Sequence, residues 1–242
     1  MGGLAALVLT SPGWPTVRET FFSWSIFKSS FPDVLAGFWL DVKIFLVVEV
    51  VVLVVGLAIA LVRISRTPAL FPVRMLGIVW VDLFRGVPTI LLIFIVGFGV
   101  PALRLTGLPT DPVVLGGIAL ALSYSAYVAE VYRAGINTVH RGQRDAARAV
   151  GLTEAQTMRH VILPQAIRRV APPLLNDFVA LQKDAALVSI LGPLEAFREA
   201  QIIEYQTFNF TPVIAAALLY LAVTVPLARV VDRMGGPEGR VR

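Results

Sequence analysis

The chain of 242 residues contains no cysteine, and it has only two histidines and three lysines. The absence of cysteine excludes disulfides and thiolate metal sites. The lysines (Lys28, Lys43 and Lys183) do not stand in a G-x-x-x-x-G-K-[ST] phosphate loop, so the chain cannot bind ATP in the P-loop manner. Both histidines, His140 and His160, lie in one basic segment, where we interpret them as solvated side chains and expect no metal site.

Charged residues are also scarce, at 15% of the chain, whereas 57% of the residues are hydrophobic and the mean hydropathy is +0.77. Soluble domains contain just under one half apolar residues. The formal net charge is +5, but the basic residues stand beside apolar runs. This arrangement indicates a membrane topology and argues against a nucleic-acid partner. The composition therefore predicts one all-α integral membrane domain.

Five apolar segments are predicted to span the membrane. The first has 19 residues, or about 28 Å of helix, which is enough for the hydrocarbon core. The second contains Gly86 and Pro88, so we expect a kinked or broken helix. The aromatic-rich residues 1–33 are predicted to form an interfacial lead-in, residues 34–232 the membrane domain, and residues 233–242 a cytoplasmic tail. The predicted spans are Ile44–Val62, Met75–Ala102, Val113–Tyr132, Leu174–Leu191 and Pro212–Val231.

The fourth predicted span contains so many polar residues that a hydropathy window rejects it. Arginine distribution favours it nevertheless. With five spans, every arginine-rich segment falls on the cytoplasmic side, with the N-terminus outside and the C-terminus in the cytoplasm. With four spans, the basic tail and the basic 133–169 loop would lie on opposite faces.

The segment 142–164 is predicted to form a helix–turn–helix outside the lipid. Gly151 stands where a helix ends in the left-handed conformation. Thr153 and Gln156 have the spacing of a capping box that begins a second helix. Pro164 is predicted to break the chain before the next apolar run. The small residues Ala146 and Ala147 would let another surface approach the backbone.

This segment resembles a known pattern: an acidic residue and two alanines (Asp145–Ala147), three further residues, Gly151, and then Ile162-Leu163-Pro164. It is similar to the cytoplasmic coupling loop of the permease subunits of bacterial ABC importers. Residues 84–88, 126–135 and 172–184 resemble the polar amino acid subfamily, and the resemblance covers residues 34–232. Asp145 replaces the glutamate that is usual in the family, so its carboxylate stands on a shorter arm.

The resemblance implies the type I ABC importer permease fold and a transport subunit that imports polar amino acids across the bacterial inner membrane, without catalysis of its own. ATP and Mg would be bound by a partner ATPase dimer, and this chain would bind no cofactor. The other implied partners are a second permease subunit, identical or a sister chain, and an extracytoplasmic solute-binding protein. The residues implied to couple to the ATPase are Asp145, Ala146, Ala147, Gly151, Leu163 and Pro164.

Polar side chains inside the predicted spans are candidates for the substrate path, because an ionisable group at mid-membrane costs at least about 2.5–3.5 kcal/mol. A zwitterionic amino acid needs a cation for its carboxylate and anions for its ammonium group. The alternative is that these charges neutralise one another and fix helix packing. Glu49, which has no clear partner, is interpreted as structural or interfacial. The candidate path residues are Arg85, Asp177, Asp184, Asn176, Lys183, Tyr127 and Glu130.

Other functions remain open at this point. An alternative is an intramembrane enzyme that uses the buried carboxylates, although no H-E-x-x-H or paired acidic metal motif is present. An autonomous channel or ion-driven carrier is disfavoured, since the five spans show no inverted repeat. The transported compound is alternatively an amino-acid-like molecule such as an opine or ectoine.

Overall fold

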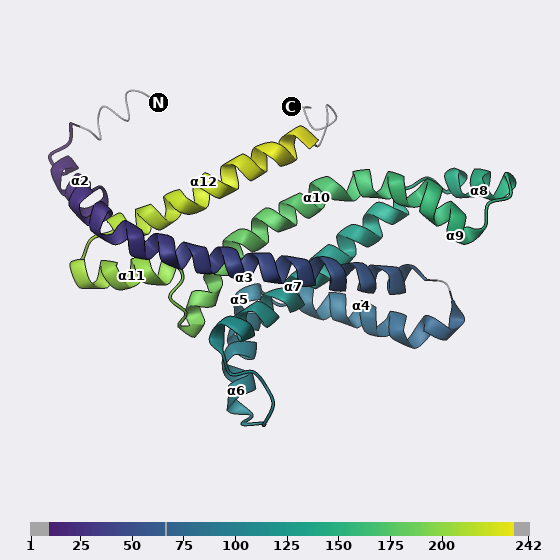
Figure 1. Ribbon diagram of the computed structural model, residues 1–242, viewed down its shortest axis with the longest axis horizontal. Coiled ribbons are helices and arrows are strands. Elements are labelled where there is room, and N and C mark those ends of the chain that lie inside the picture. Colours follow the sequence, from purple (N-terminus) through teal and green to yellow (C-terminus); the bar gives the residue numbers. More distant parts are fainter. Residues whose placement is uncertain (1–9, 66, 235–242) are drawn as a thin grey trace.

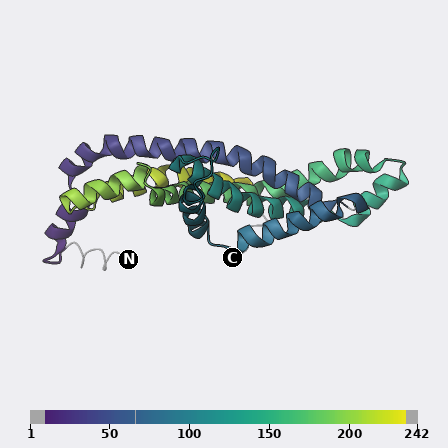
Figure 2. The same ribbon diagram turned by 90° about the horizontal axis from the view of Figure 1, so that it is seen from below.

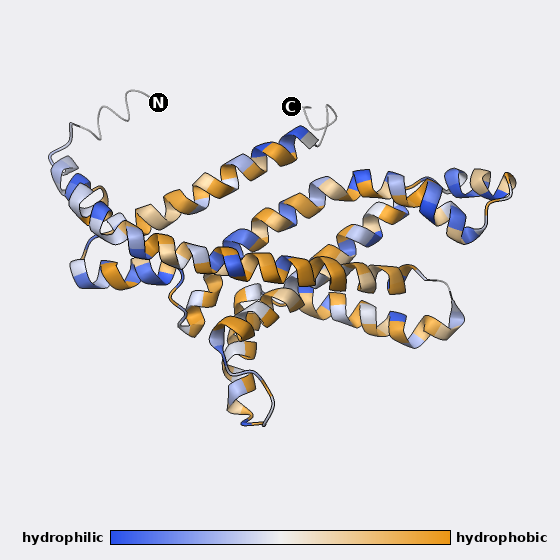
Figure 3. Cartoon of the chain, in the orientation of Figure 1, coloured by the Kyte–Doolittle hydropathy of each residue, from blue (hydrophilic) through white to orange (hydrophobic). Residues whose placement is uncertain are grey.

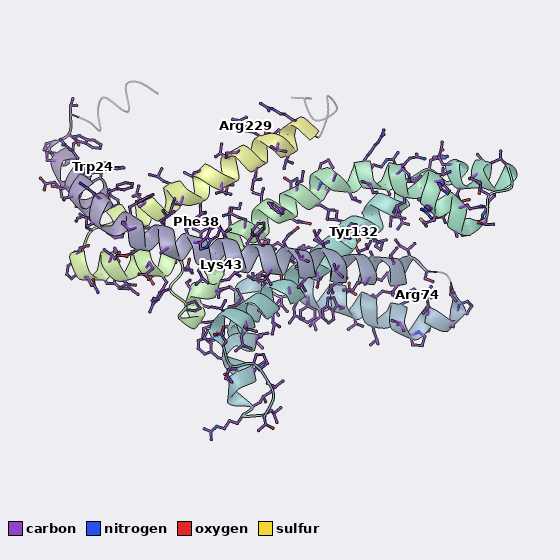
Figure 4. All side chains as sticks on the ribbon, in the orientation of Figure 1. Trp24, Phe38, Lys43, Arg74, Tyr132 and Arg229 are labelled. Carbon is purple, nitrogen blue, oxygen red and sulfur yellow. The ribbon has the colours of Figure 1, made fainter. Side chains whose placement is uncertain are left out.

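The computed structural model describes residues 10–65 and 67–234, and all regular secondary structure in them is helical. The molecule is elongated, with α2 and α11 at one end of its long axis and α8 and α9 at the other (Figure 1). Trp24 and Arg74 mark these two ends in Figure 4. The α-helices are α2 (Trp14–Phe21), α3 (Trp24–Ile64), α4 (Phe71–Gly86), α5 (Thr89–Phe94), α6 (Val100–Ala102), α7 (Pro112–Asn137), α8 (Arg141–Ala149), α9 (Glu154–Thr157), α10 (Leu163–Asp184), α11 (Ala196–Thr207) and α12 (Thr211–Met234).

Helix α3 contains 41 residues, or about 61 Å at 1.5 Å per residue, so it is longer than the hydrocarbon core of a bilayer. The predicted first span, Ile44–Val62, is only its second half. The helix begins at Trp24, inside the segment predicted as a lead-in. Tertiary packing accounts for the extension, because Val34 and Phe38 are buried against residues of α11 and α12.

The second predicted span is broken, as expected. Helices on either side of Val87 and Pro88 are bent by 103°. Proline disfavours the helical conformation of the preceding residue, and Val87 is extended with ψ of 129°. After the bend, α5 continues through a π-helical turn, η2 (Ile95–Gly99), into α6.

Both halves of this broken span are held on α7. The indole nitrogen of Trp80 donates to the Ser125 hydroxyl at 3.2 Å, and the Thr89 and Ser123 hydroxyls lie 3.0 Å apart. The main core lies around α7 and contains buried residues of α3, α5, α7 and α10. Glycines let these helices approach closely: a Cβ added to Gly135 would lie 2.0 Å from Val170 Cγ1. Figure 2 shows α3 running along much of the length of the molecule.

The predicted break at Pro164 is wrong. The chain stays helical from α9 through a π-helical turn, η3 (Met158–Ile162), into α10, and Pro164 stands at the start of α10. Proline removes one hydrogen bond of a continuing helix, and here the π-helical turn η3 directly before it keeps the chain helical. The predicted fourth span, Leu174–Leu191, is therefore the second half of α10 followed by the 3₁₀ helix η4 (Ala185–Leu191), which ends at Gly192.

By length and composition, three stretches of the described residues are able to cross a membrane, and the bent pair makes a fourth. These are residues 14–64, 112–137 and 211–233, with the bent pair at 68–102. In Figure 3, α3 and α12 are mainly hydrophobic (orange), whereas α8 and α9 are largely hydrophilic (blue). Helix α10 is not among the candidates, as its charged residues led us to expect. The five-span topology stays a prediction.

Candidate functional site

The segment between α7 and α10 forms the expected helix–turn–helix. His140 precedes α8, and its Nδ1 accepts a hydrogen bond from the Gly142 amide at 3.1 Å. Gly151 adopts φ of +87°, the left-handed conformation that glycine favours after a helix. The Thr153 amide donates to Gln156 Oε1 at 2.9 Å, and the Gln156 amide donates to Thr153 Oγ1 at 3.3 Å. The predicted turn and capping box are thus confirmed.

The two alanines of this loop face different surroundings. Ala146 is exposed, whereas Ala147 is 6% exposed. The expectation that both present a small outward surface is therefore wrong for Ala147, which lies on the inner face of α8. The outward surface is formed by Asp145, Ala146 and Gly151, together with Val150, which is 77% exposed. Leu163 and Pro164, at the start of α10, are also exposed.

An ion pair joins the two short helices of the loop. The Nε of Arg148 on α8 lies 3.1 Å from Glu154 Oε2 on α9, and Arg144 Nε lies 3.7 Å from Glu154 Oε1. Glu154 is half exposed, so each contact contributes under about 1 kcal/mol. The geometry of the loop therefore depends mainly on its caps and on Gly151.

A second group of polar residues lies where α4, α7 and α10 meet. The guanidinium carbon of Arg85 lies 5.4 Å from the centre of the Tyr127 ring, a cation–π distance. Arg85 is also close enough to Asp177 to attract its carboxylate. Three of the predicted path residues, from helices far apart in the sequence, are thus brought together.

The two aspartates of α10 differ in their hydrogen bonds. The Tyr124 hydroxyl donates to Asp184 Oδ2 at 2.8 Å. Asp177 Oδ2 is buried and has no hydrogen-bond partner among the residues that the structure describes. A buried acceptor without a partner costs about 1–3 kcal/mol, so the two aspartates of α10 differ in how far the protein satisfies them.

Sequence reasoning missed two members of this group. Tyr124 lies three residues before Tyr127, on the same face of α7, and this spacing was the available signal. Glu49 on α3 is 9% exposed and lies close enough to Asp177 for the two carboxylates to repel each other. A repelling carboxylate is not a compensating partner, so the interpretation of Glu49 as a structural or interfacial residue stays a prediction. The available signal for its place beside Asp177 was a single acidic residue within a long apolar run.

The remaining predicted path residues lie apart from this group. Glu130 binds Arg63 Nη1 at 2.9 Å and also pairs with Arg133, so its charge is compensated within the protein. Asn176 and Lys183 are exposed on α10. For Glu130, the alternative interpretation of a packing ion pair fits the geometry better than a place in the path.

Among residues 10–65 and 67–234, no three histidine, cysteine, aspartate or glutamate side chains are grouped so that they could hold a metal ion. His140 caps α8, as described, and His160 is exposed in the π-helical turn. The polar group around Arg85 brings together a cation, carboxylates and phenols.

Comparison with known proteins gives one consistent result. The family described as "Binding-protein-dependent transport system inner membrane component" matches residues 53–235. The probable glutamine ABC transporter permease protein GlnM of Bacillus subtilis (strain 168) is 39% identical over 176 residues, 72% of this chain and 79% of that protein. The arginine transport system permease protein ArtQ of the same organism is 33% identical over 197 residues, 81% and 88% of the two chains.

The solved structures that resemble this chain are also chains of ABC transporters. A chain from the "Crystal structure of an amino acid ABC transporter with histidines" superposes with a TM-score of 0.76 at 33% identity. The match covers 83% of this chain and 92% of that chain. A chain of the MetNI methionine ABC transporter in an inward-facing form has a TM-score of 0.66 at 20% identity, which shows a shared fold.

Proposed function

This chain belongs to the family of binding-protein-dependent transport system inner membrane components, and we propose that it lines the path by which a polar amino acid crosses a bacterial cell membrane. The resemblance inferred from the sequence is thereby confirmed. The chain is a multi-pass membrane subunit of an ABC importer, and ATP hydrolysis belongs to a separate subunit. Importers of this family work with an ATPase and a solute-binding protein.

The observation that carries the proposal is the group formed by Arg85, Asp177 and Tyr127 between three helices. Charged groups within membrane helices are costly, and they occur mainly where they line a pathway or pair inside the bundle. Asp177 keeps one buried oxygen without a hydrogen-bond donor, so internal pairing leaves it unsatisfied. The relatives named as glutamine and arginine permeases support an amino acid as the transported molecule.

The chemistry of the group matches a zwitterion. In this proposal, Arg85 receives the substrate carboxylate, held in orientation by the Tyr127 ring. Asp177 and Asp184 receive the cationic group, with Glu49 adding negative charge from α3. Tyr124 keeps Asp184 in place through its hydroxyl. Asn176 and Lys183 are exposed on the same helix. They line the path in this proposal if the second permease subunit packs against that face of α10.

The test is substrate binding to the purified importer without its binding protein. Asp177→Asn should weaken binding about ten- to a hundredfold, because one charge-assisted hydrogen bond contributes about 1.5–3 kcal/mol. Asp184→Asn should have a similar effect. Asp232→Asn, at an exposed position near the end of α12, is the matched control and should bind like the parent. If both α10 variants assemble and transport like the parent, the two carboxylates only fix packing.

The same assay separates an amino acid from the alternatives. An opine or ectoine that binds more tightly than any polar amino acid would replace the proposed substrate class. It would leave the roles of Arg85 and Asp177 in place.

We also propose that the outward surface of the α8–α9 loop docks the ATPase, with Asp145, Ala146, Gly151, Leu163 and Pro164 as contacts. Ala147 contributes from within, by packing α8. Ala146→Trp should abolish uptake and substrate-stimulated ATP hydrolysis while leaving membrane insertion intact, because a large side chain blocks close approach. Ala146→Ser is the control and should couple normally. Normal stimulated hydrolysis in Ala146→Trp would remove this surface from the interface.

The proposed orientation has the α8–α9 loop and the C-terminus in the cytoplasm and the N-terminus outside. Its support is the excess of arginine in the 133–169 loop and the tail over the 194–211 segment. A second permease subunit, identical or a sister chain, would complete the path.

A further inference from the structure

A basic cavity lies where α3 and α7 end and α8 begins. Its volume is about 720 Å³. Arginines from three elements line it: Arg63 of α3, Arg133 of α7, and the pair Arg144 and Arg148 on one face of α8. The other part of the wall is apolar and includes Leu61, Ile64 and Met158. The cavity is thus both cationic and partly hydrophobic.

Internal ion pairs do not balance these arginines. Arg63 and Arg133 share the carboxylate of Glu130, and Arg144 and Arg148 share that of Glu154. Around the described wall there are two more guanidinium groups than carboxylates. Each guanidinium carries five N–H donors, so one carboxylate for two arginines leaves donors for a further anion. Phosphate is well matched to them, since arginine binds it through two parallel hydrogen bonds.

The cavity lies at the ends of two candidate membrane spans, where lipid headgroups are expected. These two spans are α3 and α7. Its rim is fixed by Arg74 of α4, whose Nη1 donates to the Ser65 carbonyl at 3.3 Å. Figure 4 shows Arg74 at this end of the molecule. Basic pockets between membrane helices on the cytoplasmic side bind anionic lipid headgroups.

An apolar groove adjoins the cavity on the side of the spans. It lies between α3 and α4, has a volume of about 290 Å³, and is lined by residues such as Ile59, Leu76 and Trp80. Gly77 also lines it, and a Cβ added there would lie 3.2 Å from Cγ of Arg63. The stem of Arg63 therefore borders the groove, while its guanidinium borders the cavity.

We propose that this cavity binds the phosphate group of an anionic phospholipid, with an acyl chain of the same lipid in the groove between α3 and α4. The lipid bridges α3, α7 and α8, and so couples the α8–α9 loop to the membrane surface. Ala146 on α8 and Val150 directly after it are exposed and do not line the cavity, so they remain accessible for a partner protein.

The experiment measures lipid binding to the purified importer complex by native mass spectrometry in detergent. The probes are dioleoyl phosphatidylglycerol and dioleoyl phosphatidylcholine. We expect the complex to bind the anionic lipid several-fold more tightly than the zwitterionic one. The double variant Arg144→Gln/Arg148→Gln should lose about tenfold in affinity for phosphatidylglycerol, and the affinity for phosphatidylcholine should not change.

Arg229→Gln is the matched control, because Arg229 is exposed on α12, away from the loop (Figure 4). It removes one positive charge without touching the cavity, and it should bind phosphatidylglycerol like the parent. Thermal unfolding of each variant in the same detergent shows whether the double variant remains folded. Dihexanoyl phosphatidylglycerol tests the groove and should bind more weakly than the dioleoyl lipid.

Three results would overturn the proposal. Unchanged phosphatidylglycerol binding in the double variant would place the lipid elsewhere. Displacement of the lipid by millimolar inorganic phosphate would identify a site for a soluble anion. Unchanged lipid binding together with weaker ATPase assembly would assign the arginines to the ATPase interface.

Discussion

The two halves of α3 lie beside carboxylates that are held by different means. In the first half of α3, Asp41 Oδ2 accepts hydrogen bonds from the Tyr220 hydroxyl at 2.7 Å and the Ala196 amide at 3.3 Å. Glu195 lies beside it and accepts from the amides of Phe197 and Arg198 at the start of α11. Beside the second half, Glu130 is held by two arginines.

This difference shows two ways to keep acidic groups in an apolar bundle. Among the described residues, no ion pair supplies a cation to Asp41 or Glu195, so neutral donors and a proton stabilise these acids. Burial raises the pKa of Glu195 to about 8, and the adjacent carboxyl of Asp41 adds to the shift. Around Glu130, guanidinium groups supply the compensating charge. The stability that depends on Asp41 and Glu195 should therefore change with pH, whereas the stability that depends on Glu130 should change when one charge of its ion pairs is removed.

The largest expected effect is at the closely packed end. A Cβ on Gly37 would lie 2.6 Å from the backbone carbonyl carbon of Glu195 and 2.7 Å from the Ala196 amide nitrogen. Backbone atoms cannot move aside cheaply, so Gly37→Val should lower the free energy of unfolding by about 3 kcal/mol. Thermal unfolding of the purified complex measures this loss.

Gly77 offers the matched control at the other end of α3. An added Cβ there would lie 3.2 Å from Cγ of Arg63, which belongs to a flexible side chain. Gly77→Ala should therefore change the free energy of unfolding by less than about 1 kcal/mol. If both variants lose the same free energy of unfolding, the cost does not depend on whether the added Cβ meets backbone atoms or a flexible side chain.

Glu130→Gln should have the next largest effect, about 2 kcal/mol of stability. It leaves Arg63, whose side chain is 12% exposed, without its carboxylate partner. The loss lies between those for exposed and fully buried ion pairs because Glu130 is itself 23% exposed. Chemical denaturation of the complex measures it.

The double variant Arg63→Met/Glu130→Leu is the control for this prediction. It removes both charges together and should recover much of the stability, since apolar side chains often replace an ion pair well. Transport by the folded fraction should be normal in both variants. If the Glu130→Gln protein is as stable as the parent but fails to bind substrate, Glu130 has a role in the translocation path and not only in an ion pair.

The smallest effect concerns pH. The pKa of Glu195 in the folded protein is about 8, above its ordinary value of 4.5. Between pH 4.5 and pH 8, Glu195 is therefore protonated in the folded state and ionised in the unfolded state. Stability should therefore fall as pH rises through this range, by about 1 kcal/mol between pH 6 and pH 7, and the contribution is lost above pH 8.

Glu195→Gln tests the assignment, because the amide oxygen still accepts from the α11 backbone but does not titrate. Thermal unfolding of this variant should depend less on pH between 5 and 8 than that of the parent. Parallel pH dependence in the two proteins would show that another group carries the effect.

Much of the loop and of the broken span follows from residues close together in the sequence. Gly151 ends α8, Thr153 and Gln156 cap α9, and Pro88 forces Val87 out of the helical conformation. Each of these effects acts within four residues, so a sequence pattern is sufficient to predict it. The Pro164 prediction failed because the π-helical turn η3 before this proline keeps the chain helical, and the sequence pattern does not reveal such a turn.

Other features depended on contacts between distant residues. Glu130 pairs with Arg63, 67 positions earlier, and Glu49 lies beside Asp177, 128 positions later. Burial of Val34 and Phe38 by α11 and α12 extends α3 beyond its predicted start. The inward position of Ala147 likewise follows from the packing of α8.

The sequence by itself determined that the chain is a helical membrane protein of the importer family, where α8 ends and α9 begins, and where the second span breaks. The tertiary structure decided which charged residues meet. Helical periodicity gives the face of one helix on which a side chain lies, but the partner depends on the rotation and depth of the neighbouring helices. Those are set by packing contacts such as that of Gly135 with Val170, which join residues 35 positions apart.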